Sequence, residues 1–118
     1  MNMLLPKRPK PIEHETHRNQ VRRLPCCCTG RWDGIQAHHL VRDPNGEHCA
    51  ARRSGDPWAV PLYWEAHAKL HDGPLDEPAF FAQYGVDQIA VARKLWALTE
   101  RGLKGEAWLE EGRRIIEE

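Results

Sequence analysis

The chain has 118 residues, of which 41% are hydrophobic and 29% charged, a composition ordinary for a soluble globular protein. Its 17 basic and 17 acidic side chains give a formal net charge of zero, so the whole molecule lacks the excess basicity that often marks nucleic-acid-binding proteins. The length fits one domain, no apolar run could cross a bilayer, and the first residues lack the pattern of a secretory signal, so we expect a cytoplasmic protein with no membrane partner.

Residues 1–12 are rich in proline and basic side chains, and we expect them to form a disordered basic arm ahead of a single domain at 13–118. Three of the four cysteines are consecutive, which does not fit a disulfide framework. We favour reduced, partly buried thiols. Zinc binding by Cys26, Cys28 and Cys49 is the alternative.

The first half of the domain predicts two short strands between two helices. A polar helix is expected from residue 13 up to the proline at position 25, followed by a tight turn. The alternating, β-branched pattern of residues 34–41 predicts a strand, and residues 58–62 predict a second one, limited by its own proline. A helix over about 63–71 should end at Gly73, which a proline follows.

The last third of the chain is predicted to be helical. Asp76 and Asp87 each precede a helix as its cap, Gly85 and Gly102 end these helices, and residues 106–118 form a final helix. We expect all five tryptophans to belong to the core. Two strands with these helices make the fold class α+β.

Two histidines of the predicted helix at 63–71 point to a metal site. His67 and His71 are four residues apart, which places their Cβ atoms about 5–6 Å apart on one helix face, so both imidazoles can reach one ion. The ion needs at least one further ligand. For this pair alone, two solvated histidines are an equally good interpretation.

A second cluster, His38 and His39, ends the first predicted strand, where successive side chains point in roughly opposite directions. One imidazole can therefore bind a metal ion while the other acts as a general base in phosphodiester hydrolysis, for which an ordinary histidine pKa of about 6.5 is suitable. The alternative is one buried and one solvated histidine. We expect His14, His17 and His48 to be solvated side chains without a functional role.

The order of these motifs resembles the HNH endonucleases, the ββα-metal or His-Me finger family, and especially its compact members from phage and prophage genomes. The similarity covers roughly residues 13–98. It includes the motifs Leu24-Pro-Cys, Ala37-His-His-Leu, Trp58-Ala-Val-Pro-Leu and Ala66-His-Ala-Lys-Leu-His. The resemblance implies a ββα-metal core over about 25–73, with additional helices at the N-terminal side and over 76–118.

The resemblance also implies residue roles. His38, His67 and His71 would hold one divalent cation, and His39 would be the general base in the hydrolysis of phosphodiester bonds in DNA. Mg²⁺ is the expected catalytic ion, although imidazole ligands suit Zn²⁺, Mn²⁺ or Ni²⁺ better. Double-stranded or branched DNA is the expected partner, and RNA is an alternative.

Two features depart from the family pattern. Thr29 and Tyr63 stand where many relatives have cysteine ligands of a structural zinc, so a four-cysteine site is not available. The middle residue of the HNH name, usually asparagine or histidine, helps to orient the base. Asp56 is the nearest polar candidate for that role.

Four arginines flank the motifs in sequence and offer bidentate donors to phosphate: Arg31, Arg42, Arg52 and Arg53.

Together, the histidine motifs and the family resemblance predict a DNA endonuclease. One rival is a non-catalytic, zinc-stabilised module that binds nucleic acid or protein, and another is a metal-free helical adaptor with incidental histidines. A His39→Ala variant should lose cleavage and keep its metal if the chain is an enzyme.

Overall fold

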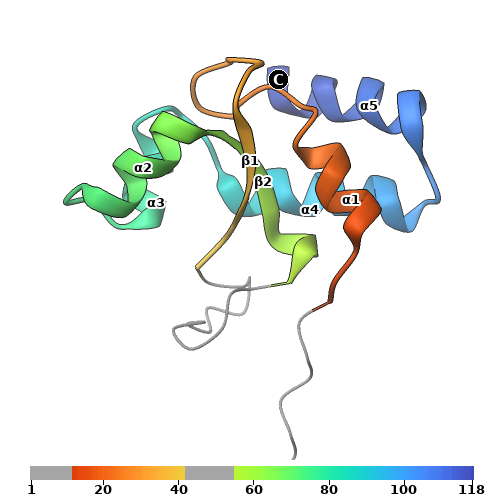
Figure 1. Ribbon diagram of the computed structural model, residues 1–118, viewed down its shortest axis with the longest axis horizontal. Coiled ribbons are helices and arrows are strands. Elements are labelled where there is room, and N and C mark those ends of the chain that lie inside the picture. Colours follow the sequence, from red (N-terminus) through yellow and green to blue (C-terminus); the bar gives the residue numbers. More distant parts are fainter. Residues whose placement is uncertain (1–11, 42–54) are drawn as a thin grey trace, which may run out of the picture.

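Figure 1 shows a computed structural model of the chain, which describes residues 12–41 and 55–118. Within these ranges the fold is α+β, with five α-helices, one 3-10 helix and a two-stranded antiparallel sheet. The elements in chain order are α1 (Glu15–Val21), β1 (Ile35–His39), η1 (Asp56–Trp58), β2 (Ala59–Tyr63), α2 (Trp64–Asp72), α3 (Glu77–Ala82), α4 (Gln88–Glu100) and α5 (Gly105–Glu117). No helix of the described part combines the length and apolarity needed to cross a bilayer. The expected basic arm, apart from its last residue, lies outside the described residues.

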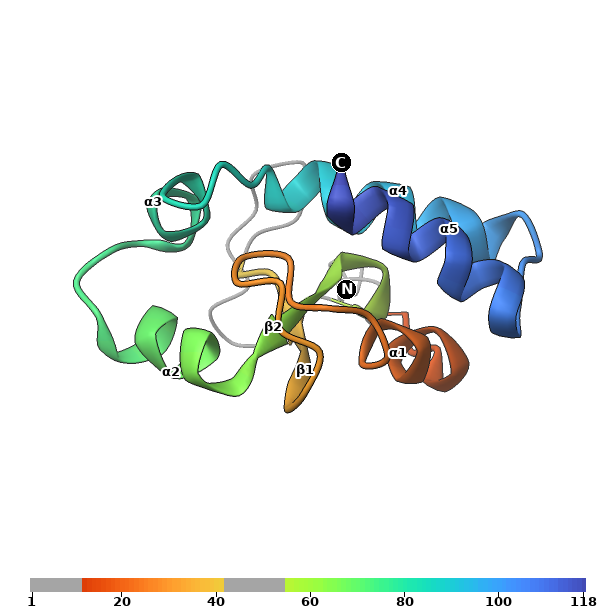
Figure 2. The same ribbon diagram turned by 90° about the horizontal axis from the view of Figure 1, so that it is seen from above.

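The sheet lies between two groups of helices, α2 and α3 on one side and α1, α4 and α5 on the other (Figures 1 and 2). β1 and β2 pair in a register that runs from Ile35 opposite Tyr63 to His39 opposite Ala59. Every residue of β2 is buried, which explains its nearly continuous apolar sequence. Pro61 is compatible with β2 because this strand pairs with β1 alone among the described residues, so one of its edges needs no ladder donor. α2 follows β2 without a loop.

α1 is the predicted short helix, but its buried face differs from the expected one. His17 is fully buried, so the expectation that it is solvated is wrong. Its ring lies edge-on to the rings of Trp96 and Trp108, and its Nδ1 is 2.6 Å from Thr99 Oγ1. A helix with few apolar side chains thus uses a neutral imidazole as part of its packing surface.

The C-terminal helices begin and end where the sequence predicts. The Asp76 and Asp87 carboxylates accept the N–H groups of Ala79 and Ala90 at 3.0 and 3.1 Å. Gly85 and Gly102, which follow the helices, have φ values of +69° and +84° and leave α3 and α4 in a left-handed conformation. α4 and α5 then pack side by side (Figure 2).

The core has two clusters, one around β2, α2 and α3 and the other around α1, α4 and α5. Trp108 is fully buried in the second cluster. Trp32 and Trp64, by contrast, are 55% and 53% exposed, so the expectation that all five tryptophans are core residues is wrong for these two. Trp32 lies in the loop before β1, and Trp64 is the first residue of α2.

Candidate metal centre and histidine–carboxylate pairs

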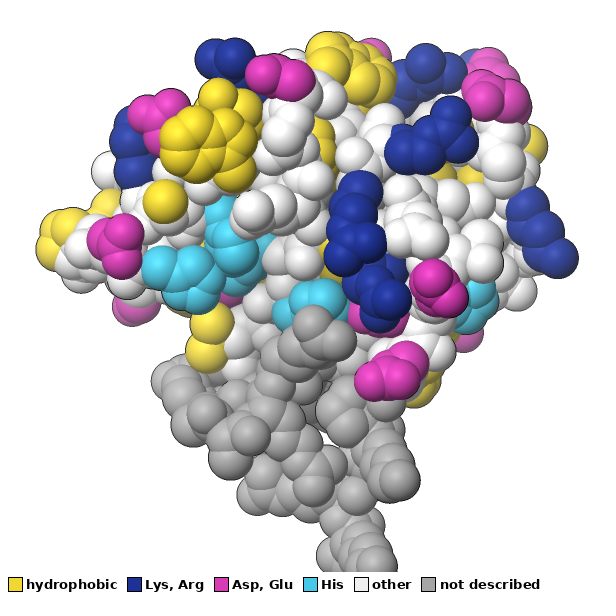
Figure 3. Space-filling model, in the orientation of Figure 1, with side chains coloured by type: hydrophobic (Ala, Val, Ile, Leu, Met, Phe, Trp, Pro, Cys, Tyr) yellow, Lys and Arg dark blue, Asp and Glu magenta, His cyan; other side chains and the backbone are white. Residues whose placement is uncertain are grey.

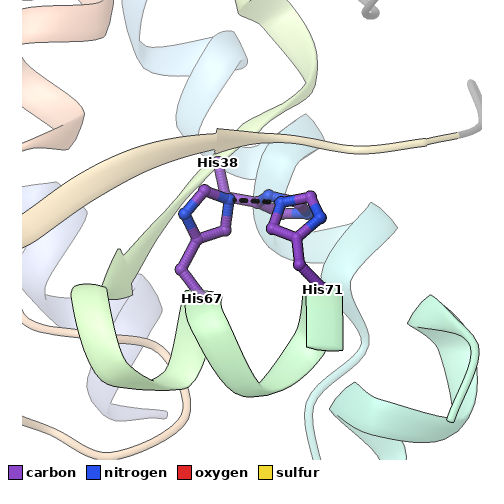
Figure 4. A group of neighbouring side chains, drawn as sticks. All are labelled: His38, His67 and His71. Atoms are coloured by element: carbon purple, nitrogen blue, oxygen red, sulfur yellow. Dashed lines mark hydrogen bonds between the residues drawn. The ribbon is translucent and has the colours of Figure 1, made fainter. Parts of the chain in front are cut away.

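Three of the predicted site histidines converge between β1 and α2 (Figure 4). One ligand atom each from His38, His67 and His71 lies within 4.8 Å of the others. Among residues 12–41 and 55–118, no other group of three or more His, Cys, Asp or Glu side chains could hold a metal ion in this way. His38 is buried, His67 is half-buried and His71 is exposed. The group therefore has a fixed inner side and an open outer side.

His67 and His71 lie one helical turn apart, and their Nε2 atoms are 3.0 Å from each other. The Nδ1 of His67 is hydrogen-bonded to Oε1 of Gln36 on β1. An amide oxygen only accepts, so Nδ1 carries the proton and Nε2 presents its lone pair toward His71. Burial, and then the neighbouring His38 and His71, lower the pKa of His67 to about 4. His67 is therefore neutral at pH 7, the state that a metal ligand requires.

The third histidine, His38, is held by a carboxylate from the other side of the site. Its Nε2 lies 2.6 Å from Oε1 of Glu77, the first residue of α3, and both side chains are more than nine-tenths buried. The second oxygen of Glu77 accepts the N–H of Val41 at 2.9 Å. With Nε2–H donated to Glu77, Nδ1 is the nitrogen that His38 offers to an ion. Sequence reasoning did not identify Glu77 or Gln36.

His39 is paired with a different carboxylate. Its Nε2 lies 2.6 Å from Oδ1 of Asp56, which is 2% exposed. The other oxygen of Asp56 accepts the N–H of His14 at 2.7 Å and a guanidinium N–H of Arg18 at 3.1 Å. Burial alone would raise the pKa of Asp56, but these bonds from His14, His39 and Arg18 hold it below its usual value. An ionised carboxylate only accepts, so Nε2 of His39 carries the proton.

The three-histidine group fits a first-row divalent ion. With metal–nitrogen bonds of about 2.1 Å, neighbouring ligand atoms are about 3.0 Å apart in an octahedral site and about 3.4 Å apart in a tetrahedral one. The 3.0 Å between the Nε2 atoms of His67 and His71 matches this range, and the ligand atom of His38 lies within 4.8 Å of both. Imidazole nitrogen ligands suit Zn²⁺, Ni²⁺ or Mn²⁺ better than Mg²⁺, which prefers oxygen ligands.

The predicted phosphate-binding arginines are only partly described. The Arg31 guanidinium is exposed, bonds the Asp33 carboxylate at 3.3 Å and lies 4.4 Å from the centre of the Tyr63 ring. Arg42, Arg52 and Arg53 lie outside the described residues. Figure 3 shows histidine side chains gathered on the face that α2 presents, with Lys and Arg side chains beside them over α1. Asp and Glu side chains lie on this face as well, so its charge is mixed.

The cysteine turn carries thiols. Cys26 is buried, Cys27 and Cys28 are half-buried, and none of the three forms a disulfide. A hydrogen bond with Cys28, together with burial, raises the pKa of Cys26 to about 12, so this thiol is protonated at neutral pH. The arrangement agrees with the predicted reduced, partly buried thiols, and Cys49 lies outside the described residues.

A family model matches most of the chain. The model of a family described as a protein of unknown function, DUF968, matches residues 1–101, which include the histidines and both carboxylates described above. No curated protein and no solved structure matches the chain. The description of the family assigns no activity.

Proposed function

We propose that this chain, which belongs to the DUF968 family, is an HNH-type endonuclease that hydrolyses phosphodiester bonds in DNA with one divalent cation. A single observation carries the proposal. At the end of β1, His38 joins a three-histidine group while the next residue, His39, is bonded to the buried carboxylate of Asp56. A candidate metal ligand and an oriented candidate base thus occur side by side. The succession β1, β2, α2 further supports the ββα-metal interpretation.

The roles follow from the hydrogen bonds. Asp56 accepts the Nε2–H of His39, which leaves Nδ1 as the unprotonated nitrogen of the ring. His39 takes a proton from the attacking water, and the Asp56 carboxylate stabilises the imidazolium that results. His38, His67 and His71 would hold the cation, which would supply positive charge to stabilise the charge developing on the phosphate and the leaving oxygen.

The main rival, a zinc-stabilised binding module, needs the three histidines but has no use for a base. It gives Asp56 only a packing role, in which the carboxylate ties η1 to α1 through His14 and Arg18. The rival therefore predicts that His39 can be replaced without functional loss. The nuclease proposal predicts the opposite.

Metal content and plasmid nicking, measured on one purified sample, test the proposal. The chain is stripped with a chelator, then reloaded with Mg²⁺, Mn²⁺, Zn²⁺ or Ni²⁺ in turn. Nicking should disappear on stripping and return with at least one ion. His39→Ala should keep its metal and lose cleavage by about 10²–10⁴-fold, the usual contribution of a general base. His71→Ala, an equally local change at an exposed side chain, should lose both metal and cleavage.

Two outcomes would overturn the proposal. Cleavage that persists after complete chelation would exclude the metal mechanism. Parental nicking by a metal-loaded His39→Ala protein would exclude His39 as the base and favour the binding module.

A further inference from the structure

An exposed tryptophan lies on the same helix face as two of the candidate metal ligands. Trp64, His67 and His71 occupy positions i, i+3 and i+7 of α2, which form one stripe along the helix. The Cβ atoms of Trp64 and His67 are therefore about 5–6 Å apart. Trp64 is 53% exposed, although the residues just before it in β2 are buried. Core packing thus does not account for the position of this indole.

The indole is held in place on one side. Its Cδ1 lies so close to Gly34 that a Cβ on this glycine would be 2.7 Å away. The backbone N–H of Trp64 donates to the carbonyl of Gly34 at 3.0 Å, and the Tyr63 ring centre is 5.6 Å from that of Trp64. A fixed indole with one open side loses little conformational freedom when a flat ligand stacks on it.

The charges around Trp64 do not oppose an anionic ligand. Asp33, which precedes Gly34 in the chain, is bonded to Arg31, and Glu65, which follows Trp64, is 3.6 Å from Lys69. Each carboxylate therefore has a basic partner. The face in Figure 3 also carries the Lys and Arg side chains over α1.

A nucleotide has the chemistry that this arrangement would recognise. Its phosphate is anionic and would lie at the three-histidine group, while its base is a flat π-system that could stack one helical turn away. In a continuous duplex the bases are stacked on one another and are not open to an indole. An unpaired base is open on its faces, and aromatic side chains bind such bases with little dependence on sequence.

We propose that Trp64 stacks on an unpaired base next to the phosphate bound at the three-histidine group, so that the preferred substrate is DNA with single-stranded nucleotides at the cleavage point. This inference rests on the proposed nuclease function. It changes the expected substrate: continuous duplex is disfavoured, and DNA with unpaired nucleotides, whether branched or single-stranded, is preferred.

The test measures binding without cleavage. The full chain carrying His39→Ala is loaded with metal and titrated into a labelled single-stranded oligonucleotide and into a blunt duplex of the same sequence. Adding Trp64→Ala should weaken binding of the single strand about tenfold or more and leave binding of the duplex unchanged. Trp64→Phe, which keeps an aromatic face, should restore most of the affinity. Unchanged metal content verifies that the neighbouring histidines are intact.

Trp32→Ala is the matched control, because this indole is equally exposed but lies off α2. It should have a much smaller effect on the single strand. Equal losses for Trp32→Ala and Trp64→Ala, equal losses on both DNAs, or no loss at all would overturn the inference. Dimerisation that Trp64→Ala abolishes would also overturn it, because the indole would then be a subunit contact.

The two proposals fail separately. If the metal-loaded parent never cleaves DNA but Trp64→Ala still selectively weakens binding of the single strand, the nuclease proposal fails and the stacking site stands. If the parent cleaves blunt duplex and single strand at equal rates, with Trp64→Ala unchanged on both, only the stacking inference fails.

Discussion

Asp56→Asn should invert the protonation of His39 while preserving the shape of the site. One oxygen of Asp56 accepts two N–H donors, from His14 and Arg18, so the amide oxygen of asparagine must take that position. The amide NH₂ then faces Nε2 of His39, which must change from donor to acceptor. The ring proton moves to Nδ1, and the nitrogen that accepts a proton in the proposed mechanism becomes an N–H.

Two magnitudes follow for Asp56→Asn. The turnover rate should fall by about 10²–10⁴-fold, as for loss of a general base. The free energy of unfolding should fall by about 2–3 kcal/mol, because hydrogen bonds to a buried charge become bonds to a neutral amide. Metal affinity should not change, since Asp56 is not hydrogen-bonded to the three-histidine group in the structure.

Nicking rates of metal-saturated protein, measured well below the unfolding midpoint, test this prediction. Arg18→Gln is the matched control: it removes a partner of the same carboxylate but not the bond to His39, so it should lower stability and spare the rate. Because Asp56 acts through His39, the double variant Asp56→Asn/His39→Ala should be no slower than His39→Ala alone. A folded Asp56→Asn protein that nicks at the parental rate would refute the reasoning.

Three further predictions concern metal affinity and pH. His71→Ala should abolish tight binding of Zn²⁺ and Ni²⁺ in calorimetric titrations, because only two converging imidazoles remain, and unchanged affinity would rule it out as a ligand. Glu77→Gln should weaken metal binding about 10–100-fold, because Glu77 holds the ring of His38. Glu100→Gln, at an exposed position of α4, is the control and should have no effect. Equal metal affinities of the two variants would show that Glu77 does not position His38. Burial lowers the pKa of His17 to about 4, whereas the unfolded chain takes up this proton near pH 6.5. The contribution of neutral His17 to stability is therefore full above pH 6.5 and falls as the pH decreases. Lowering the pH from 7 to 4 should reduce the free energy of unfolding by about 3 kcal/mol through this residue. Urea titrations with chelator should show a shallower pH dependence for His17→Gln, and identical profiles would contradict the assignment.

The features that the sequence predicted well are local in the chain. The caps of α3 and α4 depend on Asp76 and Asp87 and on the N–H groups three residues later. The pairing of His67 with His71 likewise follows from the period of one helix. Such patterns need no knowledge of tertiary structure, because backbone geometry alone brings the groups together.

The residues that position the histidines could not be found in this way. Glu77 lies 39 residues after His38, and Gln36 lies 31 residues before His67. No periodic pattern relates groups at such distances along the chain, and a glutamate at the start of a helix is already explained by the helix dipole. The sequence suggested Asp56 as the residue that orients the base only because it is the nearest polar candidate. Its bond to His39 depends on how η1 packs against the end of β1.

Burial was the least predictable property. His17 lies in a polar segment, yet it fills the space between Trp96 and Trp108 because α1 has few apolar side chains to bury there. Trp64 is apolar, yet it is exposed because the face of α2 that carries it belongs to the histidine site rather than to the core. In both cases the neighbouring elements, and not the side chain's own polarity, determine which atoms meet solvent.

The two adjacent histidines of β1 can take different roles because their carboxylates come from different elements. Glu77, from α3, receives Nε2–H of His38 and directs Nδ1 toward the candidate ion. Asp56, from η1, receives Nε2–H of His39 and fixes the tautomer of the candidate base. In the proposed mechanism, metal affinity and base activity would therefore depend on two separate hydrogen bonds. Glu77→Gln should lower metal affinity and largely keep the cleavage rate of the metal-saturated protein. Asp56→Asn should lower this rate and keep the metal affinity. If either variant changed affinity and rate equally, the two histidine–carboxylate pairs would act as one network rather than independently.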